Sequence, residues 1–128
     1  MQPIGEPNRC AIPISPQEFG VMSELPPGGF SIRDLQHRIF ELYGAKDEAR
    51  GDSATFLWLT EEFGELATAL RSGTRDELAA EMADVLAWLV TLANIRGVDL
   101  EAAVWRKYGE VCPGCRSTPC RCDPAEKP

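Results

Sequence analysis

Positive charge is scarce in this 128-residue sequence, which has 13 Lys and Arg against 20 Asp and Glu and a formal net charge of −7. A protein that binds DNA or RNA needs a basic surface to displace counterions from phosphates, so we expect no nucleic-acid polymer as a partner. Long apolar runs are also missing, because none approaches the roughly 20 residues that a membrane helix needs. The first residues lack the basic start and apolar stretch of a secretory signal. We therefore expect a small cytoplasmic protein that does not bind membranes.

Proline is absent from residues 31–112, although the chain contains ten prolines. Because proline breaks helix interiors, this block is where long helices can form. Residues 1–30 contain six prolines and no sustained periodicity, which favours an extended arm; a strand or docking peptide around residues 10–14 is the alternative. We divide the chain into this Pro-rich arm, a helical domain over residues 31–111 and a Cys-rich tail over residues 112–128.

Capping signals and apolar spacing predict four helices in the proline-free block. The predicted helices run from Ser31 to Gly44, from Asp52 or Ser53 to Gly73, from Thr74 to about Gly97, and from Asp99 to Gly109. The apolar stripes expected to form the core include Leu42, Phe56, Phe63, Leu70, Met82 and Leu89. No segment alternates apolar and polar residues for long enough to predict a strand. The sequence therefore predicts an all-α four-helix bundle, with a core small enough to favour oligomerisation.

Two pairs of carboxylates are the main chemical signal of the sequence. Glu62 and Glu65 stand three residues apart on one predicted helix, and Glu81 and Asp84 do so on the next. Residues three apart share a helix face, and the short turn between the helices allows antiparallel packing with both pairs facing each other. Four such carboxylates would repel unless a multivalent cation held them, and oxygen ligands select Mg²⁺ first and Mn²⁺ next. The alternative is that these acids form a solvated helix surface.

The pattern E-E-x-x-E followed by E-x-x-D on consecutive helices resembles that of the MazG-like nucleotide pyrophosphohydrolases. The resemblance covers about residues 31–109 and includes the phrase LTEEFGELATAL. It implies an all-α NTP pyrophosphatase fold that works as a homodimer or a dimer of dimers. It also implies Mg²⁺-dependent hydrolysis of a nucleoside or deoxynucleoside triphosphate to the monophosphate and pyrophosphate, a reaction suited to clearing unwanted nucleotides from the cell.

The resemblance also implies roles for individual side chains. The four paired carboxylates fall on the metal ligands of the family, and Glu61 or Glu62 would take the proton of the attacking water. The candidate substrate contacts are His37, Trp58, Trp88, Arg106 and Lys107. For these five, the alternatives are core tryptophans and ordinary surface residues. In the dCTP-specific branch, tryptophans would be expected where this sequence has Lys46 and Ser72, so the preferred base stays open.

Four of the five cysteines lie together near the C-terminus, at Cys112, Cys115, Cys120 and Cys122. The C-x-x-C half is typical of zinc knuckles, whereas the C-x-C half is a less common ligand pair. Bound Zn²⁺, disulfides and unstructured thiols are the three interpretations, and Cys10 has no evident partner. This tail also leaves an alternative to the enzyme: a non-catalytic helical module that senses nucleotides or recruits a partner, with a zinc- or redox-responsive tail.

Overall fold

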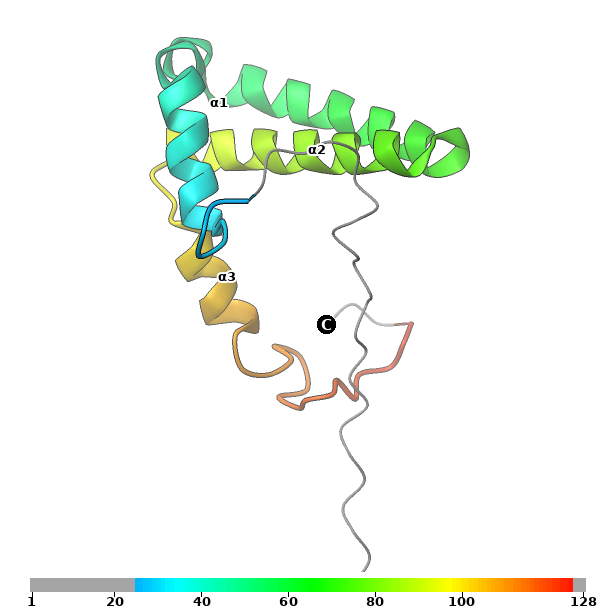
Figure 1. Cartoon of the computed structure of the whole chain (residues 1–128). Helices are drawn as coiled ribbons and strands as arrows, with labels where there is room; N and C mark the ends of the chain where they lie inside the picture. Colours follow the sequence, from blue (N-terminus) through cyan, green and yellow to red (C-terminus); the bar gives the residue numbers. More distant parts are fainter. Residues whose placement is uncertain (1–24, 126–128) are drawn as a thin grey trace, which may run out of the picture.

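The computed structural model describes residues 25–125, and these residues form helices and loops without any strand (Figure 1). The helices are α1 (Ile32–Ser72), α2 (Arg75–Ile95) and α3 (Leu100–Tyr108). The all-α prediction is thus confirmed for the described part of the chain. Most of the predicted N-terminal arm, including Cys10, lies outside the described residues.

The structure has three helices where the sequence predicted four, because the first two predicted helices are joined in α1. Gly44 does not end the helix: a Cβ there would meet the Phe40 ring at 2.9 Å, so the glycine makes room for that ring. The chain bends instead at Gly51, whose φ of 77° and ψ of 175° are accessible almost only to glycine. The two halves of α1 consequently meet at a sharp angle (Figure 1).

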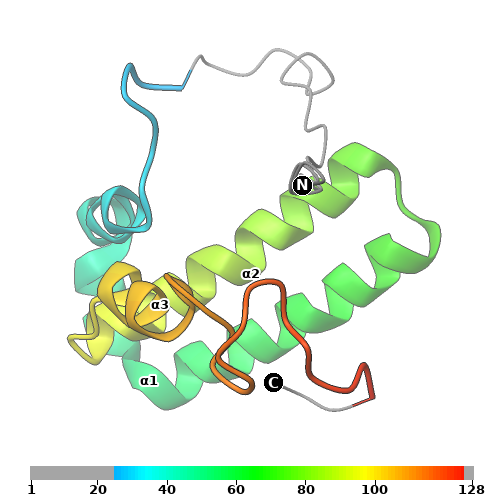
Figure 2. The same ribbon diagram turned by 90° about the horizontal axis from the view of Figure 1, so that it is seen from below.

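The second half of α1 lies antiparallel to α2, side by side in both views (Figures 1 and 2). The turn between them is short because Thr74 starts α2 directly after Gly73, where α1 is capped. As predicted, Thr74 forms a capping box: its hydroxyl accepts from the Glu77 amide, and the Glu77 carboxylate accepts from the Thr74 amide. At the opposite end of the helix pair, Arg96 forms a salt bridge of 3.0 Å with Asp52. The turn at one end and this salt bridge at the other help to set which residues of the two helices face each other.

Helix α3 is held against the first half of α1 by the buried side chain of Gln36. Its Nε2 donates to Asn94 Oδ1 over 3.1 Å and to the Val98 carbonyl over 2.9 Å, and its Oε1 accepts from the Leu100 amide. Both polar atoms of the Gln36 side chain therefore have hydrogen-bond partners, which lie between the end of α2 and the start of α3. The N-cap predicted for this helix is also present: Asp99 Oδ1 accepts a hydrogen bond from the Ala102 amide.

The buried apolar core of the described chain is small. Its members are Ile39, Leu59, Ala69, Val90 and Ala93. The predicted core residues Leu42, Phe56, Phe63, Leu70, Met82 and Leu89 are each at least 43% exposed. Ile39 and Leu59 lie on the predicted apolar stripes and are buried, but one chain leaves the other faces of those stripes exposed.

Helix α2 is long and apolar enough, by length and composition alone, to cross a membrane. This finding differs from the sequence expectation that no apolar run would reach that length. A single such helix is weak support for a membrane span, because the core helices of soluble proteins meet the same criterion.

Candidate metal centre and adjoining pocket

Three carboxylates from the two antiparallel helices converge on one point. Glu62 of α1 and both Glu81 and Asp84 of α2 each offer an oxygen, and these three oxygens lie within 4.8 Å of one another. The i,i+3 spacing puts both α2 acids on one face, and the short turn brings that face against Glu62. Three carboxylates this close form a donor set of the type that a hard divalent cation takes.

The electrostatics of this cluster favour a positive charge within it. Glu62 Oε2 and Glu81 Oε2 are buried and have no hydrogen-bond partner. Desolvation is the main cause that raises the pKa of Glu62, and the negative charges of Glu65 and Asp84 raise it further. Desolvation likewise raises the pKa of Glu81, with added repulsion from Glu65 and Asp84. Buried, unpaired carboxylate oxygens are costly, so a cation ligand would satisfy them.

The other two sequence-predicted acids lie beside the cluster and not within it. Glu61 and Glu65 are exposed and line a groove of about 550 Å³ that runs from Glu81 to the α1–α2 turn. Glu65 is near enough for its charge to raise the pKa of Glu81, although it is not one of the three carboxylates within 4.8 Å. A Cβ on Gly64 would meet no atom within 4 Å, so this part of the groove is open.

Trp88 connects the carboxylates to the bend of α1. Its Nε1 donates to Glu62 Oε1 over 3.0 Å. Its ring stacks on Trp58 with a centroid separation of 6.1 Å and lies under the guanidinium of Arg50 at 5.0 Å. Arg50 is in turn paired with the buried Asp47 over 3.0 Å. These contacts hold the indole in one orientation, so its N–H fixes the position of the Glu62 carboxylate.

A pocket of about 620 Å³ opens next to Asp84, between the first half of α1 and α2. It is lined by Leu35, Ile39, Leu42, Tyr43, Lys46, Asp47, Arg50, Ala83, Asp84, Ala87, Trp88 and Thr91. Of these residues, the sequence predicts only Trp88 as a substrate contact. It does not single out Tyr43 or Arg50, and it marks Lys46 only as a departure from the dCTP-specific branch. Tyr43, Lys46 and Arg50 are three and four residues apart and therefore share one helix face. This pattern cannot be recognised when the predicted helix ends at Gly44.

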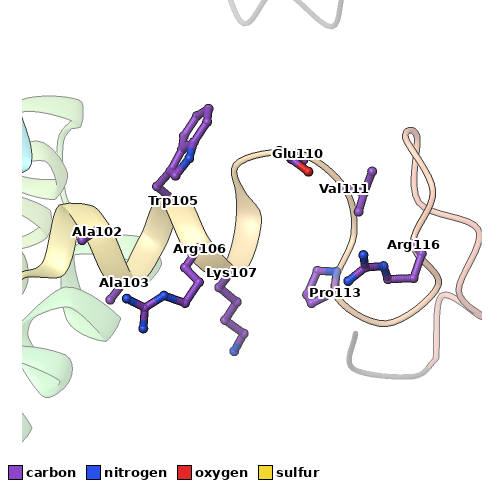
Figure 3. A pocket seen from close by; sticks show the side chains of 9 residues that line it. All are labelled: Ala102, Ala103, Trp105, Arg106, Lys107, Glu110, Val111, Pro113 and Arg116. Carbon is purple, nitrogen blue, oxygen red and sulfur yellow. The ribbon is translucent and has the colours of Figure 1, made fainter.

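The remaining predicted substrate contacts lie elsewhere in the described chain. His37 is exposed on α1 and does not line the pocket, and neither does Trp58. Arg106 and Lys107 line a separate cleft of about 820 Å³ at the end of α3, which Arg116 of the tail lines from the other side (Figure 3). The structure of one chain therefore brings Trp88, but not the other four, to the pocket beside the carboxylates.

The sequence was compared with known protein families and with curated proteins. Residues 50–116, just over half of the chain, match the family described as the MazG nucleotide pyrophosphohydrolase domain. No curated protein matches the sequence. The matched range begins at the bend of α1 and contains all three clustered carboxylates.

Proposed function

Because the chain belongs to the MazG nucleotide pyrophosphohydrolase domain family, we propose that it hydrolyses a nucleoside or deoxynucleoside triphosphate to the monophosphate and pyrophosphate, with Mg²⁺ as the metal. The observation that carries this proposal is the convergence of Glu62, Glu81 and Asp84, with buried oxygens that lack any partner. Removal of unwanted nucleotides from the cellular pool is the physiological role that we propose for this reaction.

The donor set fits Mg²⁺ better than softer metals. All three clustered ligands are carboxylates, and no histidine or cysteine of the described chain joins them. Hard oxygen donors suit Mg²⁺ and Mn²⁺, and Mg²⁺ needs only one or two carboxylates when substrate phosphates and water complete its shell. Glu62, Glu81 and Asp84 would hold the ion. Glu65 lines the adjoining groove together with Glu81 and is a further candidate ligand.

The pocket beside Asp84 has the size and the side chains for a nucleotide. Its volume of about 620 Å³ is within the usual range of small-molecule sites, roughly 300–1,000 Å³. Lys46 and Arg50 supply positive charge that would pair with phosphate oxygens, and Tyr43 supplies an aromatic face for the base or sugar. Asp47 and Asp84 line the same pocket and offset these two cations, so the metal would supply the positive charge that balances the triphosphate.

The chemistry divides between the metal and the carboxylates. Bound Mg²⁺ would neutralise charge on the phosphate oxygens and lower the barrier to attack of water at phosphorus. Trp88 keeps Glu62 in its ligating orientation through the 3.0 Å hydrogen bond. Glu61 is exposed and outside the three-carboxylate cluster, so it is free to accept the proton of the attacking water. Lys46 and Arg50 orient the triphosphate.

The test is a screen for pyrophosphate release from common and damaged nucleoside triphosphates, with Mg²⁺ and then with a chelator. We expect turnover of at least one substrate with Mg²⁺ alone, and none with the chelator. Glu62→Gln and Asp84→Asn should each lower kcat by more than about 100-fold while the helical circular dichroism is kept. Glu48→Gln is the matched control, because Glu48 is an exposed acid on the same helix and lines none of the pockets described above. Full activity in the two site variants would refute the metal assignment.

We also propose that the chain works as a homodimer or a dimer of dimers. The support is the exposed apolar surface of the α1–α2 pair, where Phe56, Leu57, Phe63, Leu70 and Met82 are each at least half exposed. Large apolar side chains that are exposed in numbers on one helix pair are typical of a subunit interface. Sedimentation velocity should give at least a dimer, and Leu57→Asp should shift the protein towards the monomer. A wild-type monomer at all micromolar concentrations would refute this proposal.

A further inference from the structure

We propose that Cys112, Cys115, Cys120 and Cys122 form a closed structural zinc site that folds the C-terminal tail. This site is distinct from the carboxylate centre, because the tail follows α3 and lies away from the α1–α2 pair (Figure 1). It also does not depend on the proposed hydrolase activity. The inference comes from the arrangement of the four sulfur atoms, from the backbone that surrounds them and from the composition of the tail.

The four sulfur atoms lie close enough together to bind one ion. All of them lie within 4.8 Å of one another. The Sγ atoms of Cys112 and Cys122 are 3.8 Å apart, and so are those of Cys115 and Cys120. Zinc–sulfur bonds of about 2.3 Å in tetrahedral geometry require sulfur–sulfur separations of about 3.8 Å. A disulfide needs about 2.0 Å, so the observed spacing matches a shared ion and not two covalent bonds.

The backbone of the tail turns so that the two cysteine pairs face each other. The Arg116 amide donates to the Cys112 carbonyl over 2.9 Å, and the Cys112 amide donates to the Ser117 carbonyl over 3.2 Å, which closes the first loop. In the second loop, the Arg121 amide donates to Cys115 Sγ over 3.2 Å. The Cys122 amide donates to Cys120 Sγ over 3.4 Å. Amide donors pointing at sulfur stabilise thiolates, which are the form that binds zinc.

The composition of the tail favours folding around a metal. Residues 112–123 contain no aliphatic or aromatic side chain apart from two prolines, so the segment has no hydrophobic core of its own. Small segments of this composition usually fold around a metal, whose binding energy replaces the missing core. Residues 112–122 also carry two arginines and no acid, which offsets the negative charge of a zinc ion with four thiolates.

The site is structural because four thiolates leave no position open for water or substrate. Zinc binding would affect the neighbouring cleft at the end of α3. Pro113 and Arg116, which stand within the cysteine loop, form one wall of the cleft at the end of α3, opposite Arg106 and Lys107 (Figure 3). Thr118 ties the loop to that helix end by donating to the Glu110 carbonyl over 3.2 Å. Metal binding would therefore keep three positive side chains around one cleft.

The test measures metal in the full chain, purified under reducing conditions without added metal and loaded with one equivalent of Zn²⁺ before gel filtration. We expect one zinc per chain and no iron. A Cys115→Ser/Cys120→Ser double variant should retain at least tenfold less zinc, roughly the loss expected when metal ligands are removed. Cys10→Ser is the matched control, and it should keep full zinc. Because the helices lie outside the tail, helical circular dichroism should be the same in all three proteins.

Two further readouts distinguish zinc from the other interpretations. In the Cys10→Ser protein, a strong chelator should expose four reactive thiols for each zinc released. Cobalt in place of zinc should give the thiolate charge-transfer and strong visible bands of a tetrahedral sulfur site, and the double variant should not. Substoichiometric zinc in the reduced wild type, iron in its place, or equal zinc in the double variant would overturn the proposal.

Discussion

Trp88 and Glu62 are joined across the α1–α2 interface by a hydrogen bond of 3.0 Å from the indole Nε1 to Oε1. The bond satisfies one oxygen of Glu62 and leaves the other, Oε2, buried and without a partner beside Glu81 and Asp84. Trp88, which the family resemblance suggests as a substrate contact, is therefore also a positioning residue for a carboxylate.

Removing the indole N–H should weaken the metal site without removing a ligand. In Trp88→Phe the aromatic ring is kept, but Glu62 loses its donor and its carboxylate can rotate. We expect the apparent Mg²⁺ affinity to fall by about 10–100-fold, as is usual when a partner of a metal ligand is lost. Mg²⁺ titrations of activity measure the change. Trp58→Phe is the control, since that ring contacts Trp88 but makes no hydrogen bond to Glu62; an equal loss in both variants would argue for a packing effect.

Without metal, neutralising Glu81 should stabilise the fold at neutral pH. Burial and neighbouring acids raise the pKa of Glu81 above its ordinary value of 4.5, so the folded state binds protons more tightly than the unfolded state. Stability is therefore lost as pH rises through the folded-state pKa. We expect Glu81→Gln to have a higher urea midpoint than wild type at pH 7 in chelator, and the difference should vanish below about pH 4.5. A variant that is less stable at neutral pH would contradict this.

Mg²⁺ should stabilise the folded chain by mass action. At a free concentration 100 times Kd, the expected gain is about 2.7 kcal/mol. Asp84→Asn removes one of the clustered ligands, so its melting temperature should respond little to Mg²⁺. Thermal melts with and without the ion measure both proteins, and Glu48→Gln should behave as wild type does. A response in Asp84→Asn equal to that of wild type would show that the ion binds elsewhere.

Replacement by alanine should change the stability of the fold in opposite directions at Gly51, in the bend of α1, and at Gly64, beyond it. Gly51 has a φ of 77° with ψ at 175°, so Gly51→Ala should destabilise the fold by about 1–3 kcal/mol. Gly64 is helical and a Cβ there meets no atom, so Gly64→Ala should stabilise the chain by about 0.5–1 kcal/mol. Urea unfolding of the two variants tests the pair, and a loss of stability in Gly64→Ala would reveal a neighbour, such as a second subunit, against this position.

Lys46 should contribute to substrate binding more than to chemistry. It lines the pocket next to Asp84, and a charged hydrogen bond to phosphate is worth about 1.5–3 kcal/mol. Lys46→Ala should thus raise KM by about tenfold or more with a small change in kcat, whereas Lys46→Arg should keep most of the affinity. Steady-state kinetics on the substrate found in the screen separate the two parameters. A large fall in kcat with unchanged KM would assign Lys46 to the reaction itself.

Much of the fold could be predicted because its signals are local. The capping boxes at Ser31 and Thr74 depend on residues three apart, and both are present in the structure. The face shared by Glu81 and Asp84 follows from helix geometry alone, and three of the four paired acids do converge. These features need no knowledge of the rest of the chain.

Other parts of the structure could not be predicted because their sequence signals are ambiguous or depend on contacts between distant residues. Gly44 and Gly51 carry the same signal of a helix end, and only the structure shows that the helix continues through Gly44 and bends at Gly51. Because the predicted helix ends at Gly44, the sequence does not show that Tyr43, Lys46 and Arg50 share one helix face. That face forms much of the pocket. The bond from Trp88 to Glu62 likewise depends on how far each helix is rotated about its axis, which periodicity does not specify to a single atom.

The bend at Gly51 divides α1 into two stretches of helix that carry different parts of the site. The pocket residues of α1 precede the bend, whereas Glu62 follows it. One residue inserted or deleted before the bend would turn the pocket-lining face by about 100° about the helix axis and would move Arg50 off the Trp88 ring. Because Trp88 is bonded to Glu62, a change of length ahead of this glycine would alter the pocket and the support of the carboxylate centre together.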